Sequence, residues 1–311
     1  MNTPARLGTY VLGLAVVFAG ALGVGGAVGA TGPAPVKNGH GGHAAPSPAT
    51  QKTEHVPGGL QVSQSGYTLT PLTTTIAPGT ETDFRFTVNG PDNRPVTAYE
   101  TEHDKKLHLI VVSRDATVFR HLHPELSGEG IWSVPLTLPD AGAYRVFADF
   151  VPQGGEGLTL GADLYAPGDY APRPLPAPSR TVTVDGYTVR LDGTLTPGAA
   201  SRLTAEISRD GKPVTDLQPY LGAYGHLVAL RVGDLAYLHV HPDGAPGDGV
   251  TPAGPGITFY AEVPSRGDYR LFLDFQHDGT VHTAAFTVRA EQGVVPTATA
   301  DHGSEHAHSG H

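Results

Sequence analysis

Short segments of apolar residues, separated by Gly- and Pro-containing turns, fill most of the chain after residue 58. Several of these segments are aromatic, β-branched or otherwise apolar, which is typical of β-strands; they lie at 84–88, 144–150, 203–207 and 269–275. About seven such strands in roughly 110 residues, with no long helical pattern among them, predict an all-β fold of antiparallel β-sandwich type. The pattern leaves open whether the sandwich is immunoglobulin-like or cupredoxin-like.

An internal repeat organises this β-rich region. The segment HLIVVSRDATVFRHLHP at 108–124 aligns without gaps on HLVALRVGDLAYLHVHP at 226–242. The segment PDAGAYRVFADF at 139–150 likewise aligns on PSRGDYRLFLDF at 264–275. A duplicated pattern of this length predicts two copies of one domain, so we expect tandem β-sandwiches.

The N-terminal segment has a different character. No charged side chain occurs from Leu7 to Ala30, a stretch long enough to cross a bilayer. The small residues Val28-Gly29-Ala30 also suit cleavage by a signal peptidase. An uncleaved membrane anchor and a removed signal peptide therefore both remain open. Either one places the rest of the chain outside the cell membrane, as an anchored ectodomain or as a secreted protein.

We therefore expect six segments along the chain. They are an anchor or signal peptide (1–30), a disordered His-, Gly- and Pro-rich linker (31–57), a first β-sandwich repeat (58–170), a Pro-rich linker (171–178), a second β-sandwich repeat (179–290) and a disordered His-rich tail (291–311).

Composition narrows the chemistry that the chain can perform. A net charge of −10 without a Lys/Arg cluster argues against nucleic acid as a partner. The chain has no Cys and only one Met, the first residue, which excludes disulfides, thiolate ligands and a blue-copper site. The metal-binding side chains that remain are 16 His and the carboxylates.

Histidines stand out when the two repeats are compared. Within the aligned 17 residues only five positions are identical, and three of these are His. Each repeat carries the pattern H-x12-H-x-H-P, formed by His108, His121 and His123 in the first repeat and by His226, His239 and His241 in the second. Because the three histidines are retained while most of the aligned positions differ, a shared constraint is expected to act on them in both repeats.

The spacing predicts a hairpin that carries the three histidines on one face. A two-residue loop at Arg114-Asp115 would place His108 across from His121, with His123 as the diagonal neighbour. A loop at Val232-Gly233 would do the same for the second repeat. Because a slip of one residue sends a side chain to the other face, the cluster depends on this register.

Three neutral imidazoles on neighbouring strands are a means of binding Zn(II) or Cu(II). Asp149 and Asp274, at matching positions in the repeats, are candidates for a fourth ligand or for an acceptor that orients an imidazole. His277 and His282 are candidates for additional ligands in the second repeat only. Such a site should release its metal below about pH 6, where free imidazole becomes protonated.

We expect a divalent-metal-binding protein outside the membrane, with one three-His site in each repeat, that sequesters or delivers the metal. Two alternatives remain open: a structural or interaction module whose histidines only pack, and a zinc-dependent hydrolytic enzyme. The second is disfavoured because no general base recurs near the histidines in both repeats. The sequence does not identify a partner that would receive the metal.

The phrase LGAYGHLVALRVGDLAYLHVHP at 221–242 resembles one found in a group of actinobacterial membrane-anchored or secreted proteins. The apolar N-terminal segment and the His/Gly-rich linker behind it are similar to theirs as well. The resemblance covers most of the chain and implies the handling of a heavy metal, copper above all, at the cell surface. It supplies no ligand set.

Overall fold

The computed structural model describes residues 56–291 except His239, and both repeats lie in one compact unit of the chain. No helix in this described part is long and apolar enough to cross a membrane. The expected anchor or signal peptide at 1–30, most of the linker at 31–57 and nearly all of the tail at 291–311 lie outside the described residues.

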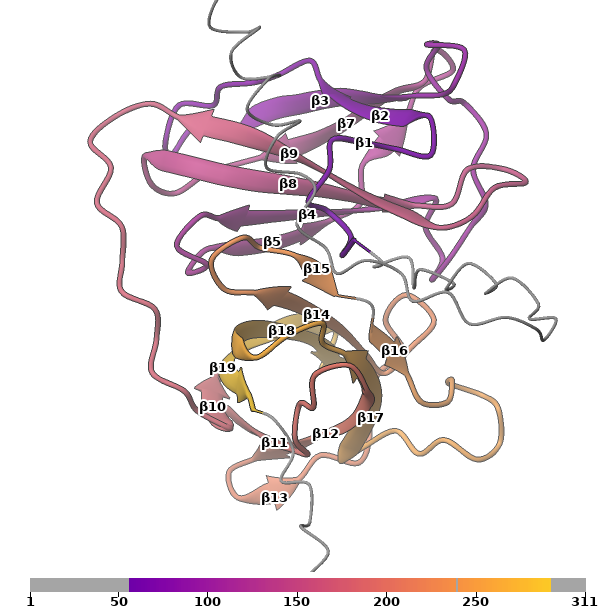
Figure 1. Ribbon diagram of the computed structural model, residues 1–311. Helices are drawn as coiled ribbons and strands as arrows, with labels where there is room; N and C mark the ends of the chain where they lie inside the picture. Colours follow the sequence, from indigo (N-terminus) through magenta and orange to yellow (C-terminus); the bar gives the residue numbers. More distant parts are fainter. Residues whose placement is uncertain (1–55, 239, 292–311) are drawn as a thin grey trace, which may run out of the picture. The chain divides into compact units, whose positions relative to one another are not determined.

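The first repeat is a sandwich of two antiparallel sheets, drawn in indigo to pink in Figure 1. One sheet has the order β1-β2-β3-β7-β6, and the other has the order β5-β4-β8-β9. The strands are β1 (Ser63–Gln64), β2 (Tyr67–Pro71), β3 (Thr82–Asn89), β4 (Leu107–Ser113), β5 (Phe119–Leu122), β6 (Glu125–Leu126), β7 (Ile131–Leu136), β8 (Gly142–Phe150) and β9 (Leu158–Ala166).

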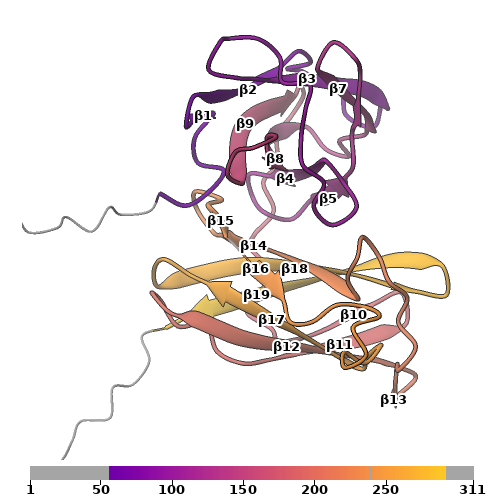
Figure 2. The ribbon, with the colours of Figure 1, turned by 90° about the vertical axis from the view of Figure 1, so that its right-hand side faces the viewer.

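The second repeat has the same two-layer arrangement, with its two sheets seen edge-on in Figure 2. The sheets have the orders β10-β11-β12-β17-β16, with β13 paired to β12, and β15-β14-β18-β19. The strands are β10 (Thr181–Val184), β11 (Tyr187–Asp192), β12 (Ala200–Arg209), β13 (Lys212–Pro213), β14 (Gly225–Arg231), β15 (Tyr237–Leu238), β16 (Val240–Pro242), β17 (Gly256–Glu262), β18 (Gly267–His277) and β19 (Thr280–Ala290). The predicted tandem antiparallel β-sandwich is confirmed.

Strand β4 is buried on both of its faces. Leu107, Leu109 and Val111 enter the interior of the first sandwich, where they join the core that includes Trp132. Ile110 and Val112 point to the other side of the sheet, as the alternation of a strand requires, and are buried as well. The unbroken apolar run LIVV at 109–112 is the sequence signature of this double burial.

A third apolar cluster, here called the inter-repeat cluster, joins the outer faces of the sheets that contain β4 and β14. Its best-defined contact is the stacking of Phe119 on Phe272, with ring centroids 4.2 Å apart and planes at 8°. The cluster consists of Ile110, Val112, Ala116, Phe119 and Phe147 from the first repeat and Val228, Leu230, Leu235 and Phe272 from the second. The two repeats therefore share a core, and the shared face is the one that carries the histidines.

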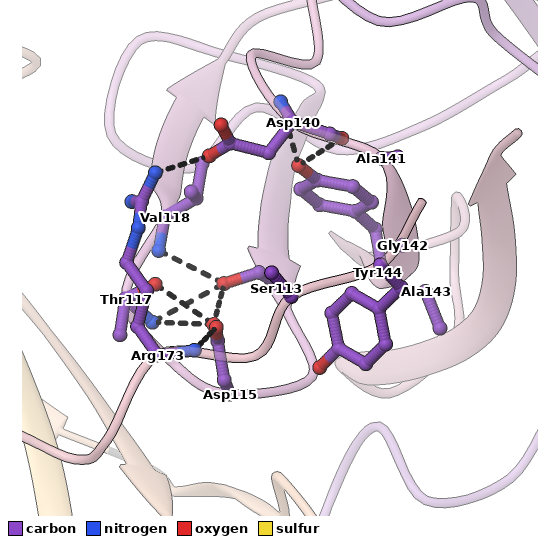
Figure 3. Close-up of a pocket in the computed structure, with 12 residues that line it drawn as sticks. Ser113, Asp115, Thr117, Val118, Asp140, Ala141, Gly142, Ala143, Tyr144 and Arg173 are labelled. Carbon is purple, nitrogen blue, oxygen red and sulfur yellow. Dashed lines mark hydrogen bonds and ion pairs between the residues drawn. The ribbon is translucent and has the colours of Figure 1, made fainter. Parts of the chain in front are cut away.

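The hairpin between β4 and β5 differs from the predicted one. Its loop has four residues, 114–117, closed by a hydrogen bond from Ser113 N to Val118 O (3.1 Å). The cause is the Asp115 carboxylate, which accepts hydrogen bonds from the backbone N–H (3.2 Å) and the hydroxyl (2.8 Å) of Thr117 (Figure 3). Within this loop Ala116 takes a φ of +56°. An Asp that bonds to the backbone two residues on stabilises a wider turn.

The register is consequently shifted by two residues. His121 lies across from Ile110, not across from His108 as predicted. The second repeat has the same shift, because its loop spans 232–235 and Leu230 pairs with Tyr237. A shift of two residues preserves the face to which each side chain points, so the predicted clustering on one face survives the error.

The inter-repeat cluster supplies the first prediction. Phe272→Ala removes a ring that is 2% exposed and leaves a cavity against Phe119. We expect the free energy of unfolding, measured by urea titration, to fall by about 3 kcal/mol. The control Val281→Ala, on the exposed edge of β19, should change it by less than about 0.5 kcal/mol. Equal effects of the two variants would show that the repeats do not share a core.

Candidate metal centre

Three histidines of the first repeat converge at the end of the β4–β5 hairpin. His108 is on β4, His121 is on β5, and His123 directly follows β5. Continuing the β4–β5 ladder by one pair places His123 across from His108. One ring nitrogen of each histidine lies within 4.8 Å of the others, and the three side chains are partly or fully enclosed.

The ring of His108 is oriented by a backbone carbonyl. Its Nε2 lies 3.2 Å from the carbonyl oxygen of Glu102, which accepts the hydrogen bond from Nε2–H. Because a neutral imidazole carries a single N–H, the lone pair is then on Nδ1. This Nδ1 faces Nε2 of His121 at 3.1 Å.

The ring of His121 is oriented by a carboxylate from the second repeat. Its Nδ1–H donates to Oδ2 of Asp274 at 2.8 Å, and both side chains are nearly inaccessible to solvent. The lone pair of His121 is therefore on Nε2, which faces the lone pair of His108. A carboxylate behind a metal-binding imidazole fixes its tautomer and raises its basicity.

The spacing of the histidine nitrogens fits a single tetrahedral metal ion. Two nitrogens bound to one tetrahedral Zn(II) at 2.0–2.1 Å lie about 3.3 Å apart, close to the 3.1 Å between His108 and His121. Two lone pairs at this distance repel unless a proton or a cation lies between them. Nε2 of His123 adds a third donor, because it is buried and has no hydrogen-bond partner. Its ring centroid is 4.8 Å from that of His121.

His226 joins the edge of this cluster from the second repeat. Its ring centroid is 6.2 Å from that of His121, farther than the spacing within the triad. Its Nε2 donates to the carbonyl oxygen of Tyr220 at 2.8 Å, the counterpart of the bond between His108 and Glu102. The two repeats therefore orient their first histidine in the same way, although only one of the two belongs to the triad.

The second repeat does not reproduce the triad among its described residues. Strand β15 ends at Leu238, and the chain then crosses to the opposite sheet, where His241 pairs with Tyr260. In the first repeat the equivalent crossing comes only after Leu122, so His121 stays beside β4. His239 lies outside the described residues. One triad is therefore present in the part of the chain that the structure describes, and the expected triad of the second repeat, which includes His239, lies partly outside it.

Asp149 and Asp274 occupy equivalent places in the two repeats but have different roles. Asp149 lies across from His108, and Asp274 lies across from His226. Each accepts a hydrogen bond from a threonine, Thr159 (2.8 Å) and Thr283 (2.6 Å) respectively. Burial raises the pKa of Asp149 to about 6, against the lowering effect of the Thr159 hydrogen bond. Asp274 differs in that it also accepts a hydrogen bond from an imidazole, that of His121 in the other repeat.

His277 and His282 lie on the opposite face of the sheet, so their expected role as ligands is not supported. Both share the inward-pointing face of the sheet with Phe275. His277 is bonded to the Tyr187 hydroxyl (2.8 Å) and to Asp216 (3.1 Å), and His282 is bonded to Asp185 (2.8 Å). Alternation along β18 explains this, since positions 275 and 277 point away from the face of Asp274.

The sequence comparison missed two nearby residues. His103 lies 5.2 Å from His226 between ring centroids, on a turn where its φ is +48°. Its counterpart in the second repeat is Leu221, so a search for shared histidines discards it. Arg270 is 4% exposed and donates to the carbonyl oxygen of Ala116 at 3.0 Å. The sequence signal for it is the Arg that recurs at matching positions of the aligned segments 139–150 and 264–275.

Burial keeps the clustered imidazoles neutral. Burial, together with the neighbouring His121, lowers the pKa of His108 to about 3. Burial likewise lowers the pKa of His123 to about 4 and that of His226 to about 4. Neutral imidazole is the form that binds metal, so the site is prepared for a cation at neutral pH.

These shifts predict how the metal-free protein responds to acid. An unfolded histidine has a pKa near 6.5, so between pH 6.5 and about 4 the unfolded chain takes up protons that the folded chain excludes. Stability is therefore fully present above pH 6.5 and is lost as the pH falls through this window. We expect a loss of about 1 kcal/mol for each buried imidazole at pH 5, after allowance for solvent screening.

Urea titrations across the pH range, with a chelator present, measure this effect. His108→Gln removes one titrating group, so its curve should be flatter than that of the wild type below pH 6.5 and parallel to it between pH 7 and 8. Parallel curves over the whole range would contradict the lowered pKa of His108.

Comparisons with known proteins give one family and several distant structural matches. No curated protein is significantly similar to the chain in sequence. The adhesin InvE of Yersinia pseudotuberculosis is 16% identical, with a TM-score of 0.24, over 73% of this chain and 60% of that one. A putative membrane-anchored protein of Corynebacterium diphtheriae is 10% identical, with a TM-score of 0.22, over 73% and 57%. The Ig1-2 module of Drosophila DLAR is 11% identical, with a TM-score of 0.20, over 72% and 98%.

The matches to InvE and to the Corynebacterium protein span less than two thirds of those chains, and at such TM-scores none of the three carries an argument about function. The family match is more extensive. The profile described as "Domain of unknown function (DUF8832)" matches residues 61–164 and 182–292, which together make up more than two thirds of the chain. The chain therefore belongs to the DUF8832 family, with one matched segment for each repeat.

Proposed function

We propose that the protein binds one divalent cation, Zn(II) or Cu(II), through His108, His121 and His123. The observation that carries this proposal is the convergence of three ring nitrogens within 4.8 Å. The facing nitrogens of His108 and His121 are oriented by fixed acceptors behind each ring, and His123 has a buried Nε2 without a hydrogen-bond partner.

The donor set supports a borderline metal. Three neutral imidazoles suit Zn(II) and Cu(II), whereas Mg(II) and Ca(II) prefer oxygen ligands. A cation held by three side chains retains a position for an exchangeable ligand. This is compatible with reversible uptake, and we propose that the protein sequesters or delivers metal outside the cell membrane, to which the apolar segment at 1–30 would anchor it or across which it would direct its export.

The main alternative is that the histidines only pack between the repeats. The fold is compatible with this alternative, because tandem β-sandwiches also serve as interaction modules. A packing role leaves Nε2 of His123 buried and unsatisfied, which costs about 1–3 kcal/mol. It also leaves one of the two contacts of His108, with the Glu102 carbonyl oxygen or with Nε2 of His121, without a hydrogen atom between the partners, because a neutral imidazole carries a single N–H. Metal binding accounts for both features with one ion.

Stoichiometry tests the proposal directly. The full chain, equilibrated with Zn(II) or Cu(II) against a competing chelator and analysed by plasma mass spectrometry, should retain one tightly bound ion. His123→Ala removes a ligand and should abolish this retention. His241→Ala removes the equivalent histidine of the second repeat, which lies exposed on β16 and pairs with Tyr260, and should leave retention unchanged.

The histidine-rich segments at 31–57 and 291–311 are identical in all three proteins, so any metal that they bind cancels from the comparison. Retention by His123→Ala equal to that of the wild type would refute the proposed site. Two tightly bound ions, one of them lost in His241→Ala, would restore the expectation of one site in each repeat.

The pH of metal release follows from the same burial. Protons compete poorly for imidazoles whose pKa values are about 3 and about 4. We therefore expect half of the Zn(II) to be released well below the pH of about 6 that unperturbed histidines imply. Dialysis against buffers from pH 7 to pH 4, followed by metal analysis, measures the midpoint. A midpoint at or above pH 6 would contradict this prediction.

A further inference from the structure

We propose that the metal site is shared between the repeats, so that metal binding and the docking of the two sandwiches strengthen each other. This inference rests on the proposed function and adds the way in which the site is regulated. Its structural basis is the hydrogen bond from His121 of the first repeat to Asp274 of the second.

Asp274 acts as a positioning residue for a ligand that its own repeat does not supply. Its Oδ2 accepts from Nδ1 of His121 at 2.8 Å, while its Oδ1 accepts from Thr283 at 2.6 Å. With both oxygens engaged, the carboxylate has little freedom to move. His121 consequently presents Nε2 to the triad only while the second repeat is docked.

The same strand of the second repeat makes two further contacts with the first repeat. Arg270, Phe272 and Asp274 occupy alternate positions of β18 and point to one face. Arg270 donates a hydrogen bond to the carbonyl oxygen of Ala116 (3.0 Å). Phe272 stacks on Phe119, with 4.2 Å between the ring centroids. The contact with His121 is therefore one end of a continuous docking surface.

The equivalent residues of the first repeat are engaged differently. Arg145 donates to the carbonyl oxygen of Gly59 (2.9 Å), a residue of the first repeat itself. Asp149 accepts a hydrogen bond from the hydroxyl of Thr159. Burial raises the pKa of Tyr237, and the negative charge of Asp149 adds to this effect. The coupling thus runs through Asp274, and Asp149 provides a matched control: a carboxylate in the equivalent position, hydrogen-bonded to a threonine instead of to an imidazole.

Linkage makes the coupling reciprocal. If docking orients His121 and so raises metal affinity by a given factor, metal must favour the docked state by the same factor. Removal of a group that orients a metal-bound imidazole typically lowers affinity 10- to 100-fold. The metal would therefore act as a clamp between the repeats.

Zn(II) affinity of the full chain, measured by competition with a chromogenic chelator, provides the first test. Asp274→Ala should weaken binding about 10- to 100-fold. Asp274→Asn keeps an oxygen that accepts from Nδ1–H, so it should recover part of this loss. Asp149→Asn, which changes only a nearby charge, should weaken binding less than about 3-fold. Circular dichroism of the metal-free variants verifies that each of them folds.

Hydrogen exchange with and without Zn(II) provides the second test. In the wild type, Zn(II) should slow amide exchange in β14 and β18 of the second repeat as well as in β4 and β5. In Asp274→Ala, saturated with Zn(II), protection should be confined to the first repeat.

The outcomes separate the two proposals. If the wild type retains neither Zn(II) nor Cu(II), the proposed function fails and the clamp fails with it. If the wild type binds one Zn(II) but Asp274→Ala binds as tightly as Asp149→Asn, or protection never reaches the second repeat, the metal site stands and the clamp is overturned.

Discussion

The packing of two sheet faces against each other is the constraint on which the rest of this structure depends. Each sandwich has one sheet whose outer face is apolar, and the stacking of Phe119 on Phe272 marks where those faces meet. Burial of these faces excludes water from the hairpin end next to them. That exclusion lowers the pKa values of His108 and His123 and leaves Nε2 of His123 without a partner. The chemistry of the site thus follows from the docking of the repeats.

Duplication produced two similar domains with different contributions to one site. In the first repeat the strand beside β4 continues to Leu122, directly before His123, whereas the second repeat changes sheets after Leu238, so that the equivalent of His123, His241, pairs with Tyr260 on the opposite sheet. The second repeat supplies Asp274 instead, as the acceptor for His121. Retention of the same residue type in both copies therefore does not mean the same role, because a docked pair of repeats has two unequal environments to fill.

Much of the fold was predictable from local patterns. Alternating and continuous apolar runs identify the strands, and the repeat doubles the evidence for each of them. The face shared by His108 and His121 was also predictable, because hairpin registers that differ by two residues preserve it. The register itself was predicted wrongly. The wider loop depends on hydrogen bonds made by Asp115 and on the positive φ of Ala116, a residue that a two-residue loop at Arg114-Asp115 would place in the following strand.

The sequence alone determined the architecture, the absence of sulfur ligands and the three imidazoles on one hairpin face, since these follow from composition and from the periodicity of a strand. Only the tertiary structure decided that there is one triad among the described residues, that Asp274 serves the opposite repeat, and that His277 and His282 point away from it. These outcomes depend on which surfaces of two separate domains meet, and contacts between residues some 150 positions apart leave no periodic signal in a single chain.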